Sequence, residues 1–244
     1  LTYGAVAVPI LHEFTPDQIY NIVNHSDAKL LFVGDVVATQ IDGTKMPALE
    51  GIVYLPDYSL VLSRTDKLTY AREHLNEMFG HKYPKYFRKE HVKYHKDQPE
   101  ELIMINYTSG TTGFSKGVML PYRSVWSNID FLIDELGSKL PANSRVLDIL
   151  PMAHTYGLVC EFLLQFVLGN HLFFLTRLPS PTVIQEAFIE IRPDVIISVP
   201  LIVEKIVRKL VFPKLNNNRV KRLMMMPGSD KKVKERMLKT VMDV

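Results

Sequence analysis

The 244-residue sequence lacks the features of a disulfide-stabilised or membrane-spanning chain. Its one cysteine, Cys160, excludes an internal disulfide framework and is compatible with a reducing compartment. The longest apolar run, residues 158–168, is too short to cross a membrane and is interrupted by Glu161 and Gln165. Two common nucleotide-binding patterns are also missing: no Gly-x-Gly-x-x-Gly follows a strand, and the P-loop spacing does not occur.

The beginning of the chain indicates an excerpt from a longer protein. The first residue is Leu1 rather than methionine, and residues 1–10 (LTYGAVAVPI) have the character of a core segment, not of a secretory leader. The composition, with 47% hydrophobic and 23% charged residues, is that of an ordinary globular protein. We therefore expect one large domain or two small ones, in a cytoplasmic protein.

The most distinctive stretch is Tyr-Thr-Ser-Gly-Thr-Thr-Gly-Phe-Ser-Lys-Gly-Val, residues 107–118. Short apolar segments at 102–106 and 118–120 flank it, and each predicts a strand. A polar loop between two strands is a surface loop on a rigid base, where ligand chemistry is common.

The residue types in this loop favour an anion such as a phosphate. Gly110, Gly113 and Gly117 permit unusual backbone dihedrals and bring N–H groups close to a ligand. Hydroxyl groups add neutral donors, and Lys116 adds a flexible positive charge. An alternative stays open on these residues alone, namely a Ser/Thr/Gly turn without a ligand.

The remaining pattern alternates strands and helices, which predicts an α/β fold with mixed sheets flanked by helices. Thr15, Pro16 and Gln18 form a helix-start signature, and residues 122–136 have an amphipathic helical stripe. Further strands are expected at 28–33, 51–55, 146–150, 171–175 and 194–199, and further helices at 161–168, 182–191 and 201–211.

Four stretches differ in character: residues 1–56, 57–101, 102–212 and 213–244. The second is a charged connector, for which we expect a solvated helix over 70–79 and then a loop. Its four histidines, His74, His81, His91 and His95, do not have the spacing of a His/Cys metal site, so a metal there is rejected.

A second motif follows the strand predicted at 146–150. In Pro-Met-Ala-His-Thr-Tyr-Gly-Leu, residues 151–158, a proline ends the strand and His154 precedes a helix. Strand ends that lead into helices are where α/β proteins place ligand groups. The alternative is a histidine that only caps the helix.

Both motifs resemble those of the adenylate-forming enzymes, which include acyl-CoA synthetases, luciferases and peptide-synthetase adenylation domains. Residues 107–118 match the signature loop of that family, except that Ser115 stands where proline is usual, and residues 150–157 match Leu-Pro-x-x-His-x-x-Gly. Arg-Pro-Asp-Val-x-x-x-Val-Pro at 192–200 is also similar. The resemblance covers nearly the whole chain and is greatest to the long-chain fatty acid–CoA ligases, so the chain would be part of the large N-terminal domain.

The resemblance implies roles for particular residues. His154 would be catalytic, near the carboxylate that is activated, and Tyr156 and Gly157 would lie with it at the acyl pocket. Thr112 would contact Mg²⁺. The contacts to the β- and γ-phosphates of ATP would come from Thr108, Ser109, Gly110, Thr111, Thr112, Gly113 and Lys116.

The implied reaction has two steps. A carboxylate attacks the α-phosphate of Mg·ATP to give acyl-AMP and pyrophosphate, and the thiol of coenzyme A then displaces AMP. The adenine-contacting motif, the magnesium-associated glutamate, the ribose-binding aspartate and the mobile C-terminal domain of the family would all lie beyond Val244. We therefore expect this 244-residue piece alone not to be a competent ligase.

Other functions and partners stay open. An aryl-acid ligase or a peptide-synthetase adenylation domain would share these motifs, and a non-catalytic ATP-binding scaffold would share the fold. Residues 205–244 hold twelve basic and three acidic residues, a pattern typical of a solvated helix with a packed apolar stripe; the alternative is peripheral contact with the inner face of a membrane. Nucleic acid is not expected, because aromatic residues do not interleave with these charges. A homodimer is a further partner that the sequence leaves open.

Overall fold

The computed structural model describes residues 3–108, 116–175 and 177–215, which form two compact units. The first unit contains the described residues within 1–127 and 153–155, and the second contains those within 128–152 and 156–244. The phosphate loop at 109–115 and most of the basic segment at 205–244 lie outside the described residues. Among the helices described, none is both long and apolar enough to cross a membrane.

The first unit opens with helix α1, Pro16–His25, whose predicted start is confirmed. Thr15 and Gln18 form a capping box, and Pro16 occupies the first turn. Helix α1 buries an apolar face that includes Ile19, Ile22 and Val23. Two short helical turns follow in this part of the unit, α2 (Asp35–Ala38) and η1 (Gly43–Lys45).

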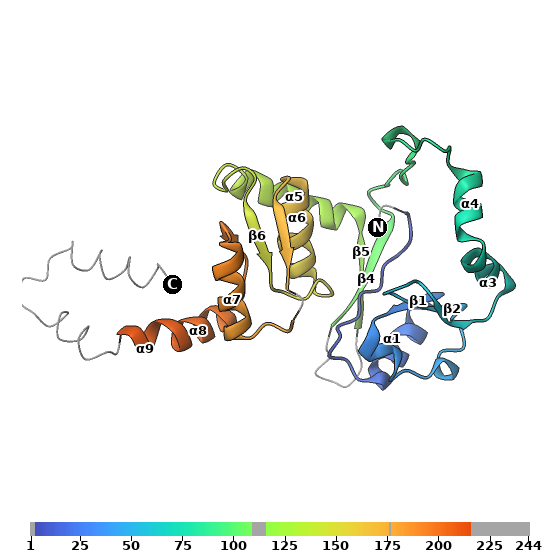
Figure 1. The fold of residues 1–244 in the computed structure, drawn as a ribbon, viewed down its shortest axis with the longest axis horizontal. Coiled ribbons are helices and arrows are strands. Elements are labelled where there is room, and N and C mark those ends of the chain that lie inside the picture. Colours follow the sequence, from blue (N-terminus) through green and yellow to red (C-terminus); the bar gives the residue numbers. More distant parts are fainter. Residues whose placement is uncertain (1–2, 109–115, 176, 216–244) are drawn as a thin grey trace, which may run out of the picture. The chain divides into compact units, whose positions relative to one another are not determined.

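A three-stranded sheet of order β1-β2-β3 belongs to the same core (Figure 1). Strands β1 (Leu30–Val33) and β2 (Gly51–Tyr54) are parallel, as the alternating pattern predicts. Strand β3 (Leu60–Ser63) pairs with β2 in the antiparallel sense. It lies in the stretch for which we expected only a helix and a loop, and at four residues it is too short to show a clear period.

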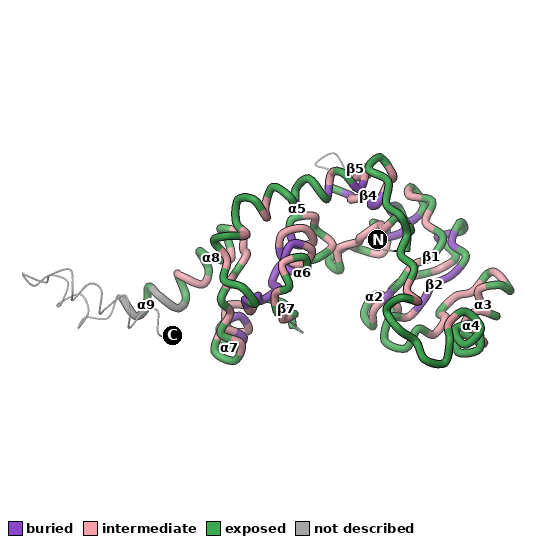
Figure 2. The backbone as a smooth tube through the Cα atoms, turned by 90° about the horizontal axis from the view of Figure 1, so that it is seen from above, coloured by how far each residue is buried: buried purple, intermediate pink, exposed green. Residues whose placement is uncertain are grey.

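The connector contains two helices instead of the single helix expected at 70–79. Helix α3 spans Asp66–Glu73 and α4 spans Leu75–Lys82, and the short helix η2 follows at Lys89–His91. The helix breaks at His74, whose backbone is non-helical and whose ring stacks on Tyr70 at 4.0 Å. Neither α3 nor α4 buries a residue, in agreement with the solvated character expected (Figure 2).

The predicted hairpin is present in the first unit. Strand β4 (Leu102–Thr108) pairs antiparallel with β5 (Lys116–Pro121), and the last paired residues are Thr108 and Lys116. The N-terminal segment joins β4 through Ala7, whose N–H donates to the Ile103 carbonyl at 3.0 Å. Helix α5 then spans Tyr122–Leu136, as its apolar stripe predicts.

The second unit contains a parallel sheet of order β7-β6-β8. Strand β6 (Arg145–Asp148) is central, between β7 (His171–Phe174) and β8 (Val195–Ile196). Figure 1 shows α6 and α7 on either side of this sheet. The helices of the unit are η3 (Gly157–Leu163), α6 (Leu164–Val167), α7 (Pro181–Ile191), α8 (Pro200–Ile206), η4 (Val207–Val211) and α9 (Phe212–Leu215).

The core of this unit lies between β6 and α7, where Leu147 and Ile149 pack with Ile184 and Ala187. Helix α7 begins at the predicted cap, because the Ser180 hydroxyl accepts from the Val183 N–H at 3.2 Å. The helix expected at 161–168 begins earlier, and its first part, η3, is a π-helix. Single turns of π-helix are frequent at functional sites.

Candidate functional site

The hairpin brings the two ends of the phosphate loop together. Thr108 and Lys116 are register partners, and both side chains are exposed at the open end of the hairpin. An exposed hydroxyl and an exposed ammonium group at one loop suit a nucleotide phosphate. The remaining predicted phosphate contacts, and the tentative Mg²⁺ contact, lie outside the described residues: Ser109, Gly110, Thr111, Thr112 and Gly113.

Tyr107 anchors the base of the hairpin to helix α1. Its side chain is buried, and its hydroxyl lies 2.7 Å from His25 Nδ1 at the end of that helix. The two rings also meet edge to face, with centroids 5.7 Å apart. Burial raises the pKa of the Tyr107 phenol, so it stays a neutral hydrogen-bonding group. Sequence reasoning missed His25, which is 82 positions away from Tyr107 and belongs to no motif.

Gly117 has a different role from the one expected. It is the strand partner of Tyr107, and it is not among the glycines with positive φ in the described chain. A β-carbon at Gly117 would lie 3.0 Å from Ile105 Cγ2 and 3.1 Å from Tyr107 Cζ. The expectation of an unusual backbone is therefore wrong for Gly117, whose missing side chain makes room for the Tyr107 ring.

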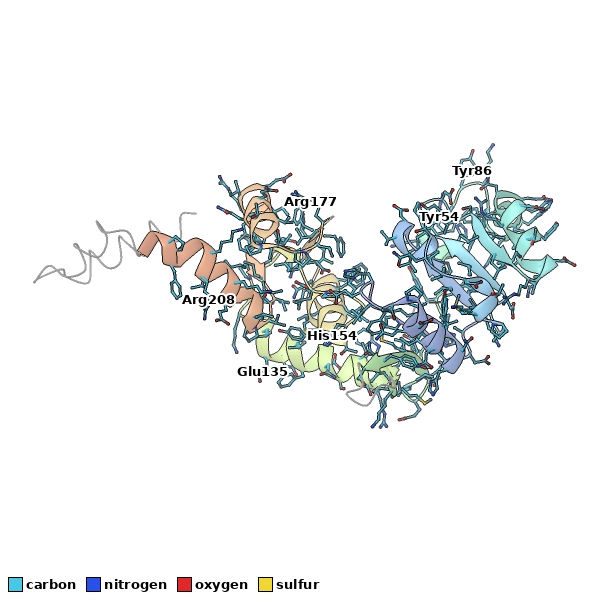
Figure 3. The ribbon with its side chains drawn as sticks, turned by 90° about the horizontal axis from the view of Figure 1, so that it is seen from below. Tyr54, Tyr86, Glu135, His154, Arg177 and Arg208 are labelled. Carbon is cyan, nitrogen blue, oxygen red and sulfur yellow. The ribbon has the colours of Figure 1, made fainter. Side chains whose placement is uncertain are left out.

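One hydrogen bond connects the hairpin to the second motif. Asn106 on β4 donates from Nδ2 to the Ala153 carbonyl at 3.1 Å, across 47 positions of sequence. Ala153 immediately precedes His154, which is labelled in Figure 3 and whose side chain is exposed. The residues that carry the loop and the predicted catalytic histidine are thus brought together within the first unit.

Tyr156 and Gly157 follow at the start of η3 in the second unit. Tyr156 is exposed, whereas Gly157 is buried. A β-carbon on Gly157 would lie 2.6 Å from the Pro151 carbonyl oxygen. The helix start therefore packs directly against the turn that ends β6, which requires glycine at this position.

Sequence reasoning missed a buried polar group behind this turn. Glu161 on η3 is fully buried, and its carboxyl oxygens accept from the Ile149 N–H at 2.8 Å and the Leu150 N–H at 2.7 Å. Burial raises the pKa of Glu161 to about 8, although the two N–H groups lower it, and the nearby Asp148 contributes a smaller part of the rise. The signal in the sequence is Glu161 itself, an acid inside an apolar run at residues 158–168.

The connector histidines have partners within the protein. His74 Nδ1 lies 3.0 Å from the Tyr70 carbonyl oxygen, and His95 Nε2 lies 2.7 Å from a Glu101 carboxyl oxygen. His91 Nδ1 accepts from the Arg88 N–H at 2.9 Å. Within the part of the chain that the structure describes, no group of three or more His, Cys, Asp or Glu residues is arranged to hold a metal ion.

The fold is that of the N-terminal domain of adenylate-forming enzymes. The N-terminal domain of FACL13 from Mycobacterium tuberculosis superposes with a TM-score of 0.62 at 22% identity, over 88% of this chain and 48% of that one. ATP-bound MatB from Rhodopseudomonas palustris superposes with a TM-score of 0.61 at 20% identity, over 84% of this chain and 36% of that one. The predicted fold class is confirmed.

The chain belongs to the AMP-binding enzyme family, whose sequence pattern matches residues 1–242. Long-chain-fatty-acid–CoA ligase 1 of Cavia porcellus is 28% identical over 177 residues, which are 69% of this chain and 24% of that protein. A 4-chlorobenzoate–CoA ligase of an Arthrobacter species is 33% identical over 66 residues, 27% of this chain and 13% of that protein. The chain thus spans about a quarter or less of the length of these relatives.

Proposed function

We propose that this chain contributes the phosphate loop and the carboxylate-activating histidine of an ATP-dependent acid–CoA ligase. The observation that carries the proposal is the hydrogen bond from Asn106 to the Ala153 carbonyl, which joins the loop hairpin to the turn before His154. In the proposed reaction a carboxylate attacks the α-phosphate of ATP, pyrophosphate leaves, and the thiol of coenzyme A displaces AMP.

Different residues of the chain have different roles in the first step. Lys116 and the hydroxyls of the loop, with Thr108 at its edge, bind the β- and γ-phosphates and stabilise their charge. His154 orients the carboxylate and stabilises the charge that develops on its oxygen. Mg²⁺, with Thr112 as its contact from this chain, would neutralise phosphate charge.

We propose a long-chain fatty acid as the acid. The similarity to the guinea-pig long-chain ligase over 177 residues supports this choice. An aryl acid is the second candidate, because a 4-chlorobenzoate–CoA ligase shares 33% identity over 66 residues. Peripheral contact of residues 205–244 with the inner face of a membrane, and a cytoplasmic location, belong to the proposal, since a long-chain acid partitions into membranes.

The identity of the acid is tested with the full-length protein. ATP, Mg²⁺ and coenzyme A are supplied with acetate, palmitate, benzoate or 4-chlorobenzoate, and the thioester is measured by mass spectrometry. The proposal predicts palmitoyl-CoA as the dominant product. A preference for the aromatic acids would establish the aryl-acid alternative, and no thioester from any acid would favour a scaffold that only binds nucleotide.

A further inference from the structure

A pair of buried carboxyl groups lies behind the turn that leads to His154. Asp148, the last residue of β6, is 6% exposed, and Glu161 is fully buried and accepts a hydrogen bond from the N–H of the residue that follows Asp148, Ile149, at 2.8 Å. Their neighbour Gln165 is also fully buried, but its amide groups bond to the Cys160 carbonyl and to Asn170. Gln165 is therefore satisfied as an ordinary core residue, whereas Asp148 Oδ2 has no hydrogen-bond partner in the described part of the chain.

The position of the pair follows from the alternation of β6. Leu147 faces the core with α7, so Asp148 points to the opposite face of the sheet, where η3 packs. Glu161 on η3 then binds the two N–H groups that immediately follow the strand, those of Ile149 and Leu150. These N–H groups begin the turn that continues through Pro151 to His154. A carboxylate that binds two backbone N–H groups fixes the direction of the chain at that point.

We propose that Glu161 and Asp148 form a proton-sharing pair that positions the turn carrying His154. Glu161 is thus a positioning residue for the reaction under "Proposed function", on which this inference rests, and it does not touch the substrate. Two carboxylates this close in a buried site cannot both be ionised at low cost, so the pair retains one proton at neutral pH. Loss of that proton places two negative charges between β6 and η3 and drives the two elements apart.

The surroundings add little charge to the pair. Burial raises the pKa of Asp148, and that of Glu161 to about 8. Among the described residues, a further titratable neighbour is the Cys160 thiol on η3, whose pKa is raised by burial and by the Glu161 charge. On β6 itself the Arg145 guanidinium is engaged with Asp194, and the neighbours from α7 are the apolar Ile184 and Ala187.

Activity provides the first readout and is measured as ATP–pyrophosphate exchange. Coenzyme A is left out, because the titration of the coenzyme A thiol would otherwise contribute to the pH profile. We expect the maximal rate of the wild-type enzyme to fall as pH rises through about 8. Asp148→Asn leaves Glu161 able to bind both N–H groups without a second charge, so it should keep the neutral-pH rate and lose the alkaline fall. Glu161→Gln should also lose the alkaline fall, and its rate should drop at least about tenfold because one N–H loses its acceptor.

Glu186→Gln is the matched control, because Glu186 is an exposed carboxylate on α7 that pairs with Arg177. It should leave both the rate and the pH profile unchanged. If Glu161→Gln does not fold, Asp148→Asn decides the question. An Asp148→Asn enzyme that keeps the wild-type alkaline fall, or a Glu161→Gln enzyme with the wild-type rate and profile, would overturn the inference.

The pH dependence of unfolding gives a readout that does not depend on activity. Between the ordinary pKa of glutamic acid, 4.5, and about 8, the folded protein holds a proton that the unfolded chain has lost. Its free energy of unfolding should therefore fall as pH rises through this window, and Glu161→Gln should flatten the fall. An inactive wild-type protein that shows this slope would refute the proposed function alone, whereas equal slopes in the wild type and Glu161→Gln would refute the carboxyl pair.

Discussion

Gly157→Ala tests the close packing of η3 against the turn before His154. The added β-carbon would lie 2.6 Å from the Pro151 carbonyl oxygen and 3.2 Å from Leu150 Cβ. The nearest obstacle is backbone, which cannot rotate out of the way as a side chain can. Overpacking of this kind costs about 1–3 kcal/mol. Alanine regains about 0.5–1 kcal/mol over glycine in a helix, so we expect a net loss of about 1 kcal/mol.

Gly80→Ala is the matched control, because Gly80 lies inside helix α4 with no atom within 4 Å of the added β-carbon. It should stabilise the full-length protein by about 0.5–1 kcal/mol, through helix propensity alone. Both variants are compared with the wild type by urea denaturation and by ATP–pyrophosphate exchange. Gly157→Ala should be the less stable variant, and its exchange rate should fall because the turn that leads to His154 is displaced. Equal stabilisation by the two substitutions would refute the close approach of η3 to the turn.

Three further predictions concern single residues. His154→Ala should lower the exchange rate by about 10²–10³ while the unfolding midpoint stays close to that of the wild type, because the side chain is exposed; an unchanged rate would remove its catalytic role. Tyr107→Phe should lose about 1 kcal/mol of stability in urea denaturation, and the loss should vanish in a His25→Ala background because the shared hydrogen bond is already broken. The Arg145 guanidinium lowers the pKa of Asp194 to about 2 from 3.8, so its stabilisation is present above pH 4 and is lost as pH falls toward 2. In thermal unfolding, Asp194→Asn should reduce the loss of stability that the wild type shows between pH 4 and pH 2. An unchanged loss of stability in this range would mean that the ion pair is not formed.

Local patterns predicted the parts of the fold that depend on neighbouring residues. The capping box of Thr15 and Gln18, the Ser180 cap and the amphipathic helix at 122–136 need only a few turns of sequence, and all three are present. The two strands of the loop hairpin were also predicted, because a polar loop separates two apolar segments. These features follow from the spacing of apolar residues and from the chemistry of helix caps, without knowledge of the tertiary packing.

Contacts between distant segments could not be predicted in this way. The Tyr107–His25 and Asn106–Ala153 hydrogen bonds depend on how the hairpin docks on elements 82 and 47 positions away. Gly117 was misread for the same reason, since its role depends on its cross-strand partner and on the ring packed there. The buried role of Glu161 needed the position of η3 behind β6, because only that position provides two backbone N–H groups to accept.

Under the proposed function, the full-length protein activates a carboxylate with ATP. Exchange of labelled pyrophosphate into ATP, measured with Mg²⁺ and palmitate and without coenzyme A, tests this step alone. We predict exchange that requires the acid and falls strongly in Lys116→Ala, because that variant lacks the charge that binds the phosphates. Folded wild-type protein that catalyses no exchange with palmitate or with any other acid would contradict it.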